Sequence, residues 1–474
     1  MAPIELLVGL DIGTTMTKAA VVSPAGEEIS WGSVPTPWRV VPSGAETEPA
    51  DILGAAVQAM GAALEAAPPG RVVGLGVTSM AETVALLGKD GRPVAPAIAW
   101  HDDRGEDEAA ELARVFGGTA FSERTGLVAS PMCTLTKLAW LSRHNGPRAH
   151  RALSVADWVV HSLGGEQAAE ASLASRTGAL SLVGRRWWTE GLEWAEAPPD
   201  LFAPVVQAGE PLGKITVDAL QRAPAARRYP HMLERLRGAA LTSAGHDHMC
   251  IAAALGVIGP AQILGSCGTA EAFVMTVAPM DGPAVRSAVE AGISVGWSTV
   301  PGRYALLSGQ MLGLLLERVL ALLGVAGTDA VAALDAAAQS TPAGSLRVVK
   351  EDLEARASIL DLGASASPAA LWSAALNCLS DGARRIVGAM QAVAGPVETA
   401  GEAGELVLSG GWARCTGLRQ RRKGLFPNVR WPAVTEAGAR GAAMFGGCAA
   451  GLFSGPADFP VPADQPLRLS LGSA

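Results

Sequence analysis

A strand, a tight turn and a second strand open the chain, and this hairpin constrains the fold more than any other feature. Residues 6–10 and 19–22 are short apolar runs, separated by a turn rich in Gly and Thr. Such a turn offers backbone N–H groups and hydroxyls to phosphate oxygens, while an acid at the strand end faces a hydrated metal ion. An ordinary hairpin, with Gly for its turn and Thr for its strands, is the alternative. The candidate residues are Asp11, Gly13, Thr14, Thr15 and Lys18.

The same pattern returns about half a chain later. Residues 261–276 read AQILGSCGTAEAFVMT, which predicts a strand, a Gly/Ser/Thr turn and another strand. Because two similar turns occupy matching places, we expect two lobes that each open with a hairpin. A triphosphate gripped from both sides needs this arrangement, although each turn alone is also explained as an ordinary hairpin. The candidate phosphate contacts here are Ser266, Gly268 and Thr269.

Strands and helices alternate along the rest of the chain, which predicts the α/β class. We interpret residues 184–237, which are polar and rich in Pro and Trp, as an insertion between the lobes. The domain boundary is expected at residue 243, which gives domains 1–243 and 244–474. Strands are expected at 72–77 and 405–409, and helices at 106–116, 134–143, 157–163, 311–323 and 367–394.

Composition excludes several classes of protein. With 49% apolar and 17% charged residues the chain can bury a large core, which excludes disorder and fibres. A net charge of −8 lacks the basic field that nucleic acid or an anionic membrane demands. The six scattered cysteines predict buried thiols in a reducing compartment. No signal peptide or membrane-spanning run is evident, so we expect a cytoplasmic protein.

Asp247 is the main candidate for acid–base chemistry. It follows a Gly by two residues, precedes an Ala-rich segment and lies between two histidines, so we expect it at a helix start facing a cleft. A carboxylate there can accept the proton of a hydroxyl that attacks a γ-phosphate. An N-cap Asp explains the local pattern equally well. The two histidines invite a metal site, which we set aside because no third ligand stands at suitable spacing.

Several motifs together resemble the FGGY family of carbohydrate kinases, and the likeness covers most of the chain. The hairpin that contains Asp11 resembles the first phosphate motif of the family. Residues 132–144 (MCTLTKLAWLSRH) are similar to its signature segment, and residues 100–104 (WHDDR) to its W-x-D-x-R motif. The adenosine motif and the closing helix resemble residues 410–415 (GGWARC) and 436–443 (EAGARGAA), and all parts occur in the family's order.

The resemblance implies two actin-like, ribonuclease H-like ATPase domains around a central cleft, with sugar in the first and nucleotide held largely by the second. It implies ATP and Mg²⁺ as cofactors, Asp247 as general base and Asp11 as the carboxylate associated with the metal. The nucleotide contacts that it implies are Gly13, Thr14, Thr15, Lys18, Ser266, Gly268, Thr269, Gly410, Gly411, Arg414 and Gln420.

The substrate is less closely defined by the resemblance. Glu82 is similar to the residue that glycerol kinases carry at this position. Ala81 stands where those kinases have a neighbouring Arg, and xylulose kinases have a His at the position of Glu82. We expect ATP-dependent phosphorylation of a small sugar or polyol, with a ketopentose-like acceptor favoured. The alternatives are an actin-like ATPase without an acceptor and a catalytically silent sugar-binding regulator. The candidate substrate contacts are Ala81, Glu82, Trp100, Asp102 and His248.

A basic cluster follows the adenosine-like motif, formed by Arg414, Arg421, Arg422 and Lys423. A contact with the nucleotide phosphates and the solvated face of a helix are the two interpretations, and we favour the second. The family often shows Ala-Asp where Arg422 and Lys423 stand. As partners we expect a small-molecule substrate and a homodimer, without nucleic acid or membrane.

Overall fold

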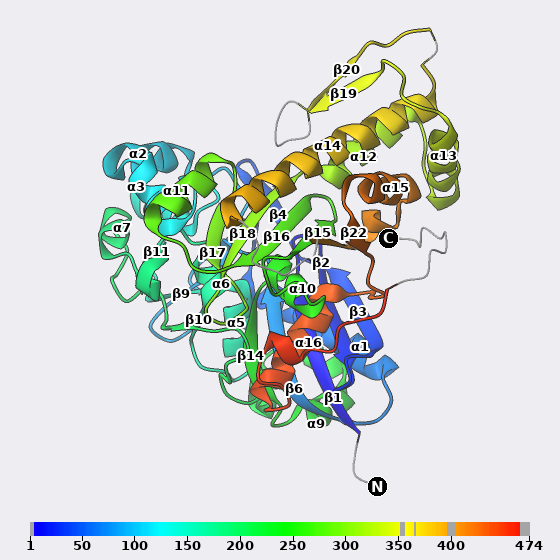
Figure 1. The fold of residues 1–474 in the computed structure, drawn as a ribbon. Helices are drawn as coiled ribbons and strands as arrows, with labels where there is room; N and C mark the ends of the chain where they lie inside the picture. Colours follow the sequence, from blue (N-terminus) through cyan, green and yellow to red (C-terminus); the bar gives the residue numbers. More distant parts are fainter. Residues whose placement is uncertain (1–3, 351–355, 365, 396–403, 465–474) are drawn as a thin grey trace.

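Two mixed β-sheets form the framework of the chain (Figure 1). The computed structural model describes residues 4–350, 356–364, 366–395 and 404–464. In the first sheet the strand order is β14-β6-β1-β2-β3, with β1, β6 and β14 parallel and the hairpin β1–β2 antiparallel. Its strands are β1 (Glu5–Ile12), β2 (Met16–Val22), β3 (Glu28–Pro35), β6 (Arg71–Ser79) and β14 (Ala240–His246).

The second sheet repeats the opening hairpin of the first. Its order is β17-β18-β16-β15-β21-β22, in which β15 and β16 form an antiparallel hairpin and β15 runs parallel to β21. Both predicted strand–turn–strand units are therefore present. The strands are β15 (Gln262–Cys267), β16 (Glu271–Val277), β17 (Ser294–Trp297), β18 (Tyr304–Gln310), β21 (Glu405–Ser409) and β22 (Asn428–Arg430).

Glycines in the first sheet let a helix from the end of the chain lie directly on it. The helix α16 (Ala437–Ala449) contacts β1, β6 and β14. A Cβ atom at Gly9 would lie 1.8 Å from the carbonyl oxygen of Ala439, and one at Gly76 would lie 2.0 Å from that of Ala442. Any side chain at these strand positions would push the helix away. The other face of the sheet is covered by α1 (Pro49–Ala66), which contacts β2 and β3.

The helix α10 (Asp247–Ala254) packs between the two sheets (Figure 1). Met249 and Ala252 belong to an apolar cluster with Leu264 and Val274 of the second sheet. Cys250 and Ala253, on another side of the helix, belong to a cluster with residues of α16 and of the first sheet. The first residue of α10 is therefore fixed relative to both halves of the molecule.

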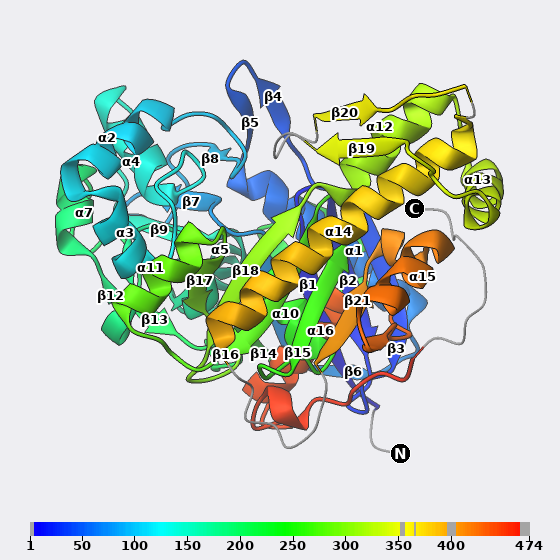
Figure 2. The ribbon, with the colours of Figure 1, turned by 45° about the horizontal axis from the view of Figure 1, so that its top comes forward.

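Long helices cover the second sheet, and α14 lies across it (Figure 2). Ser367 caps this helix by accepting a hydrogen bond from the N–H of Ala370, and Trp372 in its second turn is fully buried. The helices of this half are α11 (Gly282–Glu290), α12 (Leu312–Leu323), α13 (Thr328–Ser340), α14 (Pro368–Ala394) and α15 (Thr416–Leu425), and a small hairpin joins β19 (Arg347–Lys350) to β20 (Ala357–Leu360).

The region 184–237 packs against the first half of the fold, and Gln207 within it also donates to the carbonyls of Ser298 and Thr299 between β17 and β18, so this segment contacts both halves. It precedes β14, which pairs with β6 inside the first sheet, and α9 (Pro230–Leu236) packs against β6 and α1. The expected domain boundary after residue 243 falls within β14, and the division into 1–243 and 244–474 stays a prediction. The shorter elements before it are α7 (Thr189–Trp194), α8 (Val217–Gln221), β11 (Leu180–Ser181), β12 (Arg186–Trp187) and β13 (Val205–Val206).

A layer of shorter elements lies at the side of the first sheet and carries the remaining motifs (Figure 2). Three of its helices pack around a cluster that includes Leu112, Phe121 and Leu135, and the other two contribute Val159 and Leu173 to the core of the first sheet. The helices are α2 (Glu106–Phe116), α3 (Gly118–Thr125), α4 (Thr134–Arg143), α5 (Val155–Ser162) and α6 (Ala171–Ala174), and the strands are β4 (Arg39–Val41), β5 (Gly44–Thr47), β7 (Val84–Leu87), β8 (Ala97–Ile98), β9 (Arg151–Ser154) and β10 (Ala169–Glu170).

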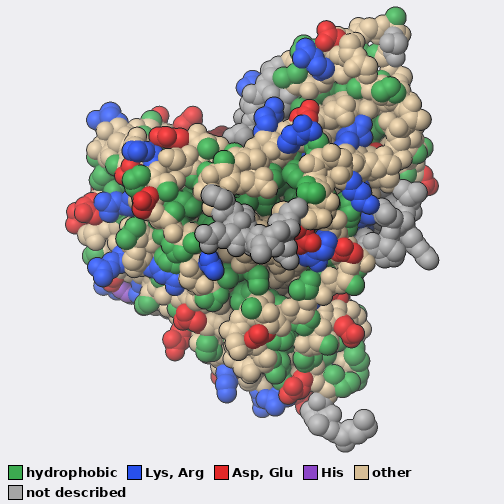
Figure 3. Space-filling model, viewed as in Figure 1, with side chains coloured by type: hydrophobic (Ala, Val, Ile, Leu, Met, Phe, Trp, Pro, Cys, Tyr) green, Lys and Arg blue, Asp and Glu red, His purple; other side chains and the backbone are tan. Residues whose placement is uncertain are grey.

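The surface carries charges of both signs, and the cysteines form no disulfide among the described residues. Acidic and basic side chains are interspersed over the face that Figure 3 shows. All six cysteines are free, and four are buried, while Cys378 and Cys448 are partly exposed.

Among the described residues no single helix is long and apolar enough to cross a membrane, and only the pair α12 and α13, bent by 95°, meets that criterion together.

Candidate active site

The carboxyl ends of three parallel strands meet at one edge of the first sheet. Ser79 at the end of β6 pairs with Ile12 of β1 on one side and with His246 of β14 on the other. Asp11, the segment after Ser79 and Asp247 are therefore placed side by side. In open α/β sheets this edge is where ligands bind.

Asp11 lies against the first turn of α16. Its Oδ2 is 2.1 Å from the position that a Cβ at Gly438 would take, so only Gly leaves room for the carboxyl group there. Its Oδ1 accepts no hydrogen bond from any described residue. Burial first, and then the nearby Asp247, raises the pKa of Asp11 to about 7, although Lys18 opposes the shift. A buried acid with a free oxygen is suited to a metal ion, which would restore its charge.

Lys18 lies opposite Asp11 on the neighbouring strand of the hairpin. Its Nζ is 2.7 Å from Oε2 of Glu436, the residue that precedes α16. The ion pair between Lys18 and Glu436 therefore links the first hairpin to the segment just before α16.

Two tryptophans fix the turn of the first hairpin. The indole N–H of Trp38 donates to the backbone oxygen of Thr14 at 2.6 Å, and that of Trp100 donates to its side-chain Oγ1 at 2.9 Å. Gly13 donates its N–H to the carbonyl of Met16 at 3.1 Å, and Thr15 is exposed. Trp100, expected near the substrate, thus lies beside the predicted phosphate turn.

Asp247 is the first residue of α10 and follows β14 directly. Its carboxylate is 19% exposed, and its Oδ1 accepts the backbone N–H of His248 at 2.6 Å. Nε2 of His246 lies 3.2 Å from the same oxygen, and Nδ1 of His248 lies 3.8 Å from it. Burial lowers the pKa of His246 to about 3, so this ring is neutral near pH 7.

A buried acid and a serine, which the sequence analysis missed, support the backbone before Asp247. Ser172 Oγ accepts the N–H of His246 at 2.9 Å and donates to Oε2 of Glu170 at 2.5 Å. Gly245 has φ +83°, and a Cβ there would lie 2.5 Å from Ser172 Oγ. Burial raises the pKa of Glu170 to about 8. No local motif marks this pair, because its partners on β14 lie more than 70 residues away.

Glu82 is held in place by a residue that the sequence did not single out. It has φ +63°, a left-handed conformation that is uncommon outside Gly and that occurs at ligand-binding positions. Its Oε1 accepts from Nε of Arg176 at 2.7 Å, and Arg176 Nη1 donates to Ser294 Oγ of β17 at 2.9 Å. Arg176 therefore joins this candidate substrate residue to the second sheet. Ala81, its neighbour, is buried.

The carboxylate of Asp102 is already engaged within the protein. Its Oδ1 accepts from the backbone N–H and Nε of Arg104, and its Oδ2 accepts from Arg104 Nη2 and from the N–H of Ala45. Although burial favours the neutral acid, the bonds from Arg104 hold the pKa of Asp102 below its usual range. These contacts are those of an anchor for the loop around β5, and a substrate contact by Asp102 stays a prediction.

The second hairpin meets the adenosine-like motif at the edge of the second sheet. Ser266 pairs with Ser409, so Gly410 and Gly411 follow directly beside the turn. Gly410 has φ +95°, and a Cβ there would lie 2.5 Å from the carbonyl oxygen of Cys267. This close approach requires Gly.

The turn of this hairpin lies against a helix start. Gly268 and Thr269 are exposed, and the N–H of Leu314 in the first turn of α12 donates to the carbonyl of Thr269 at 3.1 Å. A Cβ at Gly313 would lie 2.5 Å from the carbonyl oxygen of Gly268. The start of a helix beside exposed Gly and Thr favours an anionic ligand.

The interpretation of the basic cluster as a solvated helix face is wrong for Arg422, whereas Lys423 is exposed. Both Arg422 and Glu271 are 0% exposed, and Nη2 of Arg422 donates to the two carboxylate oxygens of Glu271 at 2.8 and 2.7 Å. Arg414 lies in the 3₁₀ turn Gly411–Arg414 before α15. Gln420 is exposed, and its amide donates to Gln339 of α13 at 3.0 Å, so a nucleotide contact by Gln420 stays a prediction.

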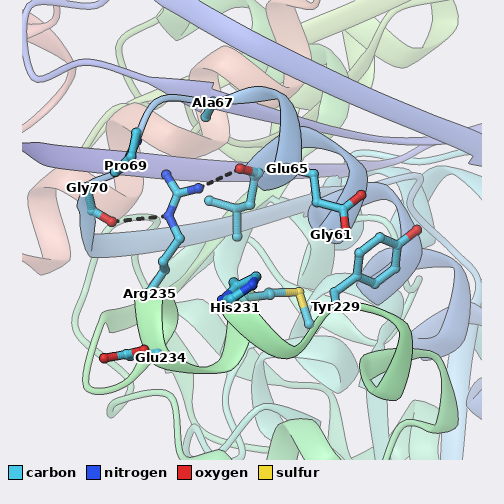
Figure 4. Close-up of a pocket in the computed structure, with 11 residues that line it drawn as sticks. Gly61, Glu65, Ala67, Pro69, Gly70, Tyr229, His231, Glu234 and Arg235 are labelled. Carbon is cyan, nitrogen blue, oxygen red and sulfur yellow. Dashed lines mark hydrogen bonds between the residues drawn. The ribbon is translucent and has the colours of Figure 1, made fainter.

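A pocket of about 380 Å³ lies away from these residues, between the end of α1 and α9 (Figure 4). It adjoins Gly70 at the start of β6, whereas the candidate site follows Ser79 at the end of that strand. Arg235 there donates to the carbonyls of Leu64 and Gly70 and so caps the end of α1 (Figure 4).

Comparisons with known proteins show which family the chain resembles. Residues 6–228 match the model of the FGGY family of carbohydrate kinases, N-terminal domain. The chain is 29% identical to a gluconokinase of Bacillus subtilis over 43% of this chain and 40% of that protein. It is 30% identical to a xylulose kinase of Streptomyces rubiginosus over 68% of this chain and 63% of that protein. The matched segments thus span less than two thirds of these curated relatives.

The solved structures extend the likeness to nearly the whole chain. The crystal structure of xylulose kinase from Rhodospirillum rubrum has a TM-score of 0.80 at 26% identity and covers 96% of this chain and 92% of its own. The expected fold class is confirmed: the chain has the mixed α/β fold of these kinases, with two actin-like ATPase domains.

Proposed function

We propose that the chain is a carbohydrate kinase of the FGGY family and that it transfers the γ-phosphoryl group of ATP to a hydroxyl of a small sugar or polyol. The observation that carries the proposal is the position of Asp247. The carboxylate of Asp247 is partly exposed and lies near Asp11. Asp247 is also the first residue of α10, the helix that packs between the two sheets.

The described residues fit the cofactors that the family implies. Oδ1 of Asp11 has no hydrogen-bond partner within the described part of the chain and is the kind of oxygen ligand that Mg²⁺ prefers. The exposed Thr269, beside the start of α12, offers its backbone N–H and its hydroxyl to phosphates. When bound, MgATP supplies the phosphoryl group and offsets its developing charge.

Within this proposal each residue has one task. Asp247 accepts the proton of the attacking hydroxyl, and Ser172 positions it through the backbone of His246. Thr14 and Lys18 hold phosphate oxygens from the first hairpin, and the second hairpin holds them from the other side. Most of the catalysis then comes from positioning and from charge neutralisation, because phosphoryl transfer needs little covalent chemistry from the protein.

The acceptor is proposed to be a ketopentose or another small polyhydroxylated molecule. Relatives are named as a xylulose kinase and a gluconokinase, and both names refer to compounds with several hydroxyls. The ion pair with Arg176 holds Glu82 in one orientation, which favours contacts with particular hydroxyls. The homodimer and the cytoplasmic location stay predictions.

An acceptor screen tests the proposed function. ADP release from MgATP is followed with pentuloses, hexuloses, aldonates and polyols, each against a sample without acceptor. A sugar kinase shows ADP release that depends on one class of acceptor and gives a phosphorylated product by mass spectrometry. ADP release at the same rate with and without every acceptor would instead indicate an ATPase and would contradict the proposal.

A further inference from the structure

Three potential metal ligands converge where Asp247 begins α10. Nε2 of His246 and Nδ1 of His248 lie 3.2 and 3.8 Å from Oδ1 of Asp247, and one ligand atom from each residue falls within 4.8 Å of the others. We propose that His246, Asp247 and His248 bind a divalent transition-metal ion of the Zn²⁺ type, at the carboxylate assigned to proton transfer.

The spacing fits a tetrahedral ion. Zn²⁺ binds imidazole nitrogen and carboxylate oxygen at about 2.0–2.1 Å, which places neighbouring ligand atoms about 3.3 Å apart. The separation of 3.2 Å already matches. The separation of 3.8 Å and that between the two ring nitrogens, which is within 4.8 Å, shorten when the His248 ring rotates toward Nε2 of His246. The two rings stand 5.4 Å apart at 63°, so they approach the carboxylate from different directions.

The donor set selects a transition metal over Mg²⁺. Two imidazoles and one carboxylate are a common ligand set of zinc sites that keep a position open for water or substrate. Mg²⁺ prefers oxygen ligands, and the residue placed to supply one is Asp11. The two metals therefore have separate sites.

Burial and charge support binding at this point. His246 is 6% exposed, its Nε2 faces the carboxylate, and its Nδ1 has no hydrogen-bond partner among the described residues. His248 is 32% exposed and leaves a path from solvent. The negative field at the site comes from Asp247 and the neighbouring Asp11, and it is opposed by Arg176 near His246 and by Lys18 near Asp11.

The sequence offers no further ligand at the spacing that is usual in zinc sites. The third ligand is Asp247 itself, since the turn from β14 into α10 lets three successive residues face one point. A sequence pattern of His-Asp-His at a strand-to-helix turn is the signal that identifies it.

A metal ion bound here blocks the proposed reaction. It takes up the Asp247 oxygen that is needed to accept the proton of the acceptor hydroxyl, so the acceptor and the ion compete. This consequence rests on the proposed function, whereas the binding site itself does not. We therefore expect micromolar Zn²⁺ to inhibit turnover at constant MgATP and to raise the KM for the acceptor.

Cobalt binding tests the site independently of activity. The full-length protein is stripped with a chelator and titrated with Co²⁺ alone, without Mg²⁺ or nucleotide, and the visible absorption of ligated Co²⁺ is recorded. We expect one equivalent to bind, with loss of the signal when Zn²⁺ is added. No visible band, or binding that Zn²⁺ does not displace, overturns the proposal.

Two variants and a control locate the ion. His248→Asn is expected to weaken Co²⁺ binding by about tenfold or more, because one of three protein ligands is lost. Asp247→Asn, an isostere, is expected to weaken it similarly and serves if His248→Asn does not fold. His150→Asn, a substitution of an exposed histidine elsewhere, leaves binding unchanged. Equal affinity in Asp247→Asn and in the unmodified protein overturns the assignment, even if no acceptor is ever phosphorylated.

Discussion

Replacement of Arg422 by Met tests whether the ion pair with Glu271 holds the two nucleotide-facing segments together. Glu271 is the first residue of β16 and follows the turn of the second hairpin. Arg422 lies in α15, which follows the adenosine-like motif. Gln310 also donates to Glu271 Oε2 at 2.7 Å, so the carboxylate is the centre of a buried network.

The expected loss follows from complete burial. Both partners are 0% exposed, and removal of one charge leaves the other buried without its counter-ion, which costs about 3–5 kcal/mol. The double variant Glu271→Leu with Arg422→Met removes both charges and also the unpaired Nε and Nη1 of Arg422. It is expected to lie within about 1 kcal/mol of the original protein, the residual cost being the hydrogen bond of Gln310.

Urea unfolding followed by tryptophan fluorescence and by circular dichroism measures these differences. We expect Arg422→Met to lower the midpoint by about 1 M and the double variant to recover most of that loss. Lys423→Met, at the exposed neighbouring position, is the matched control and should shift it only slightly. Additive effects of the two single substitutions, or equal midpoints for Arg422→Met and Lys423→Met, would refute the reasoning.

Three further predictions concern buried acids near the candidate site. Asp11→Asn removes a buried charge that Asp247 repels, so stability should be kept while Mg²⁺-dependent turnover falls about 100-fold or more; parallel loss of thermal stability and activity would indicate a structural role. Glu82→Ala should raise the KM for the acceptor about tenfold with little change in kcat, and an unchanged KM would remove Glu82 from the substrate site. The raised pKa of Glu170, about 8, means that the fold keeps its proton, so this contribution to stability is present below about pH 4.5 and is lost as the pH rises through 8. Glu170→Gln should therefore gain stability relative to the original protein over this interval, by up to about 1.4 kcal/mol per pH unit, in unfolding experiments at several pH values; a constant difference would contradict the shift.

Local sequence patterns predicted those helices and strands whose ends are determined by residues close together in the sequence. The helices 106–116 and 134–143 and the strand 405–409 have the expected bounds, because turn residues and apolar periodicity define their ends. Both Gly/Thr hairpins were also predicted, since their turns are encoded within a few residues.

Contacts between distant segments could not be predicted in this way. Arg422 lies among other basic residues and resembles a surface position, and only Glu271, 151 residues away, explains its burial. Arg176 reaches Glu82 across 94 residues and Ser294 across 118, and no motif surrounds it. The polar region 184–237 resembles an inserted segment until the pairing of β14 with β6 places it within the first half of the fold.

Turnover and nucleotide binding in Asp247→Asn test the central claim most directly. Asn keeps the shape of the side chain and the hydrogen bond from the backbone of His248 but removes the group that accepts a proton. With an acceptor found in the screen, we predict loss of phosphorylation by at least about 100-fold, together with unchanged affinity for ADP by calorimetry. Full turnover in this variant, with ADP bound as tightly as before, would show that the carboxylate at the start of α10 is not the base.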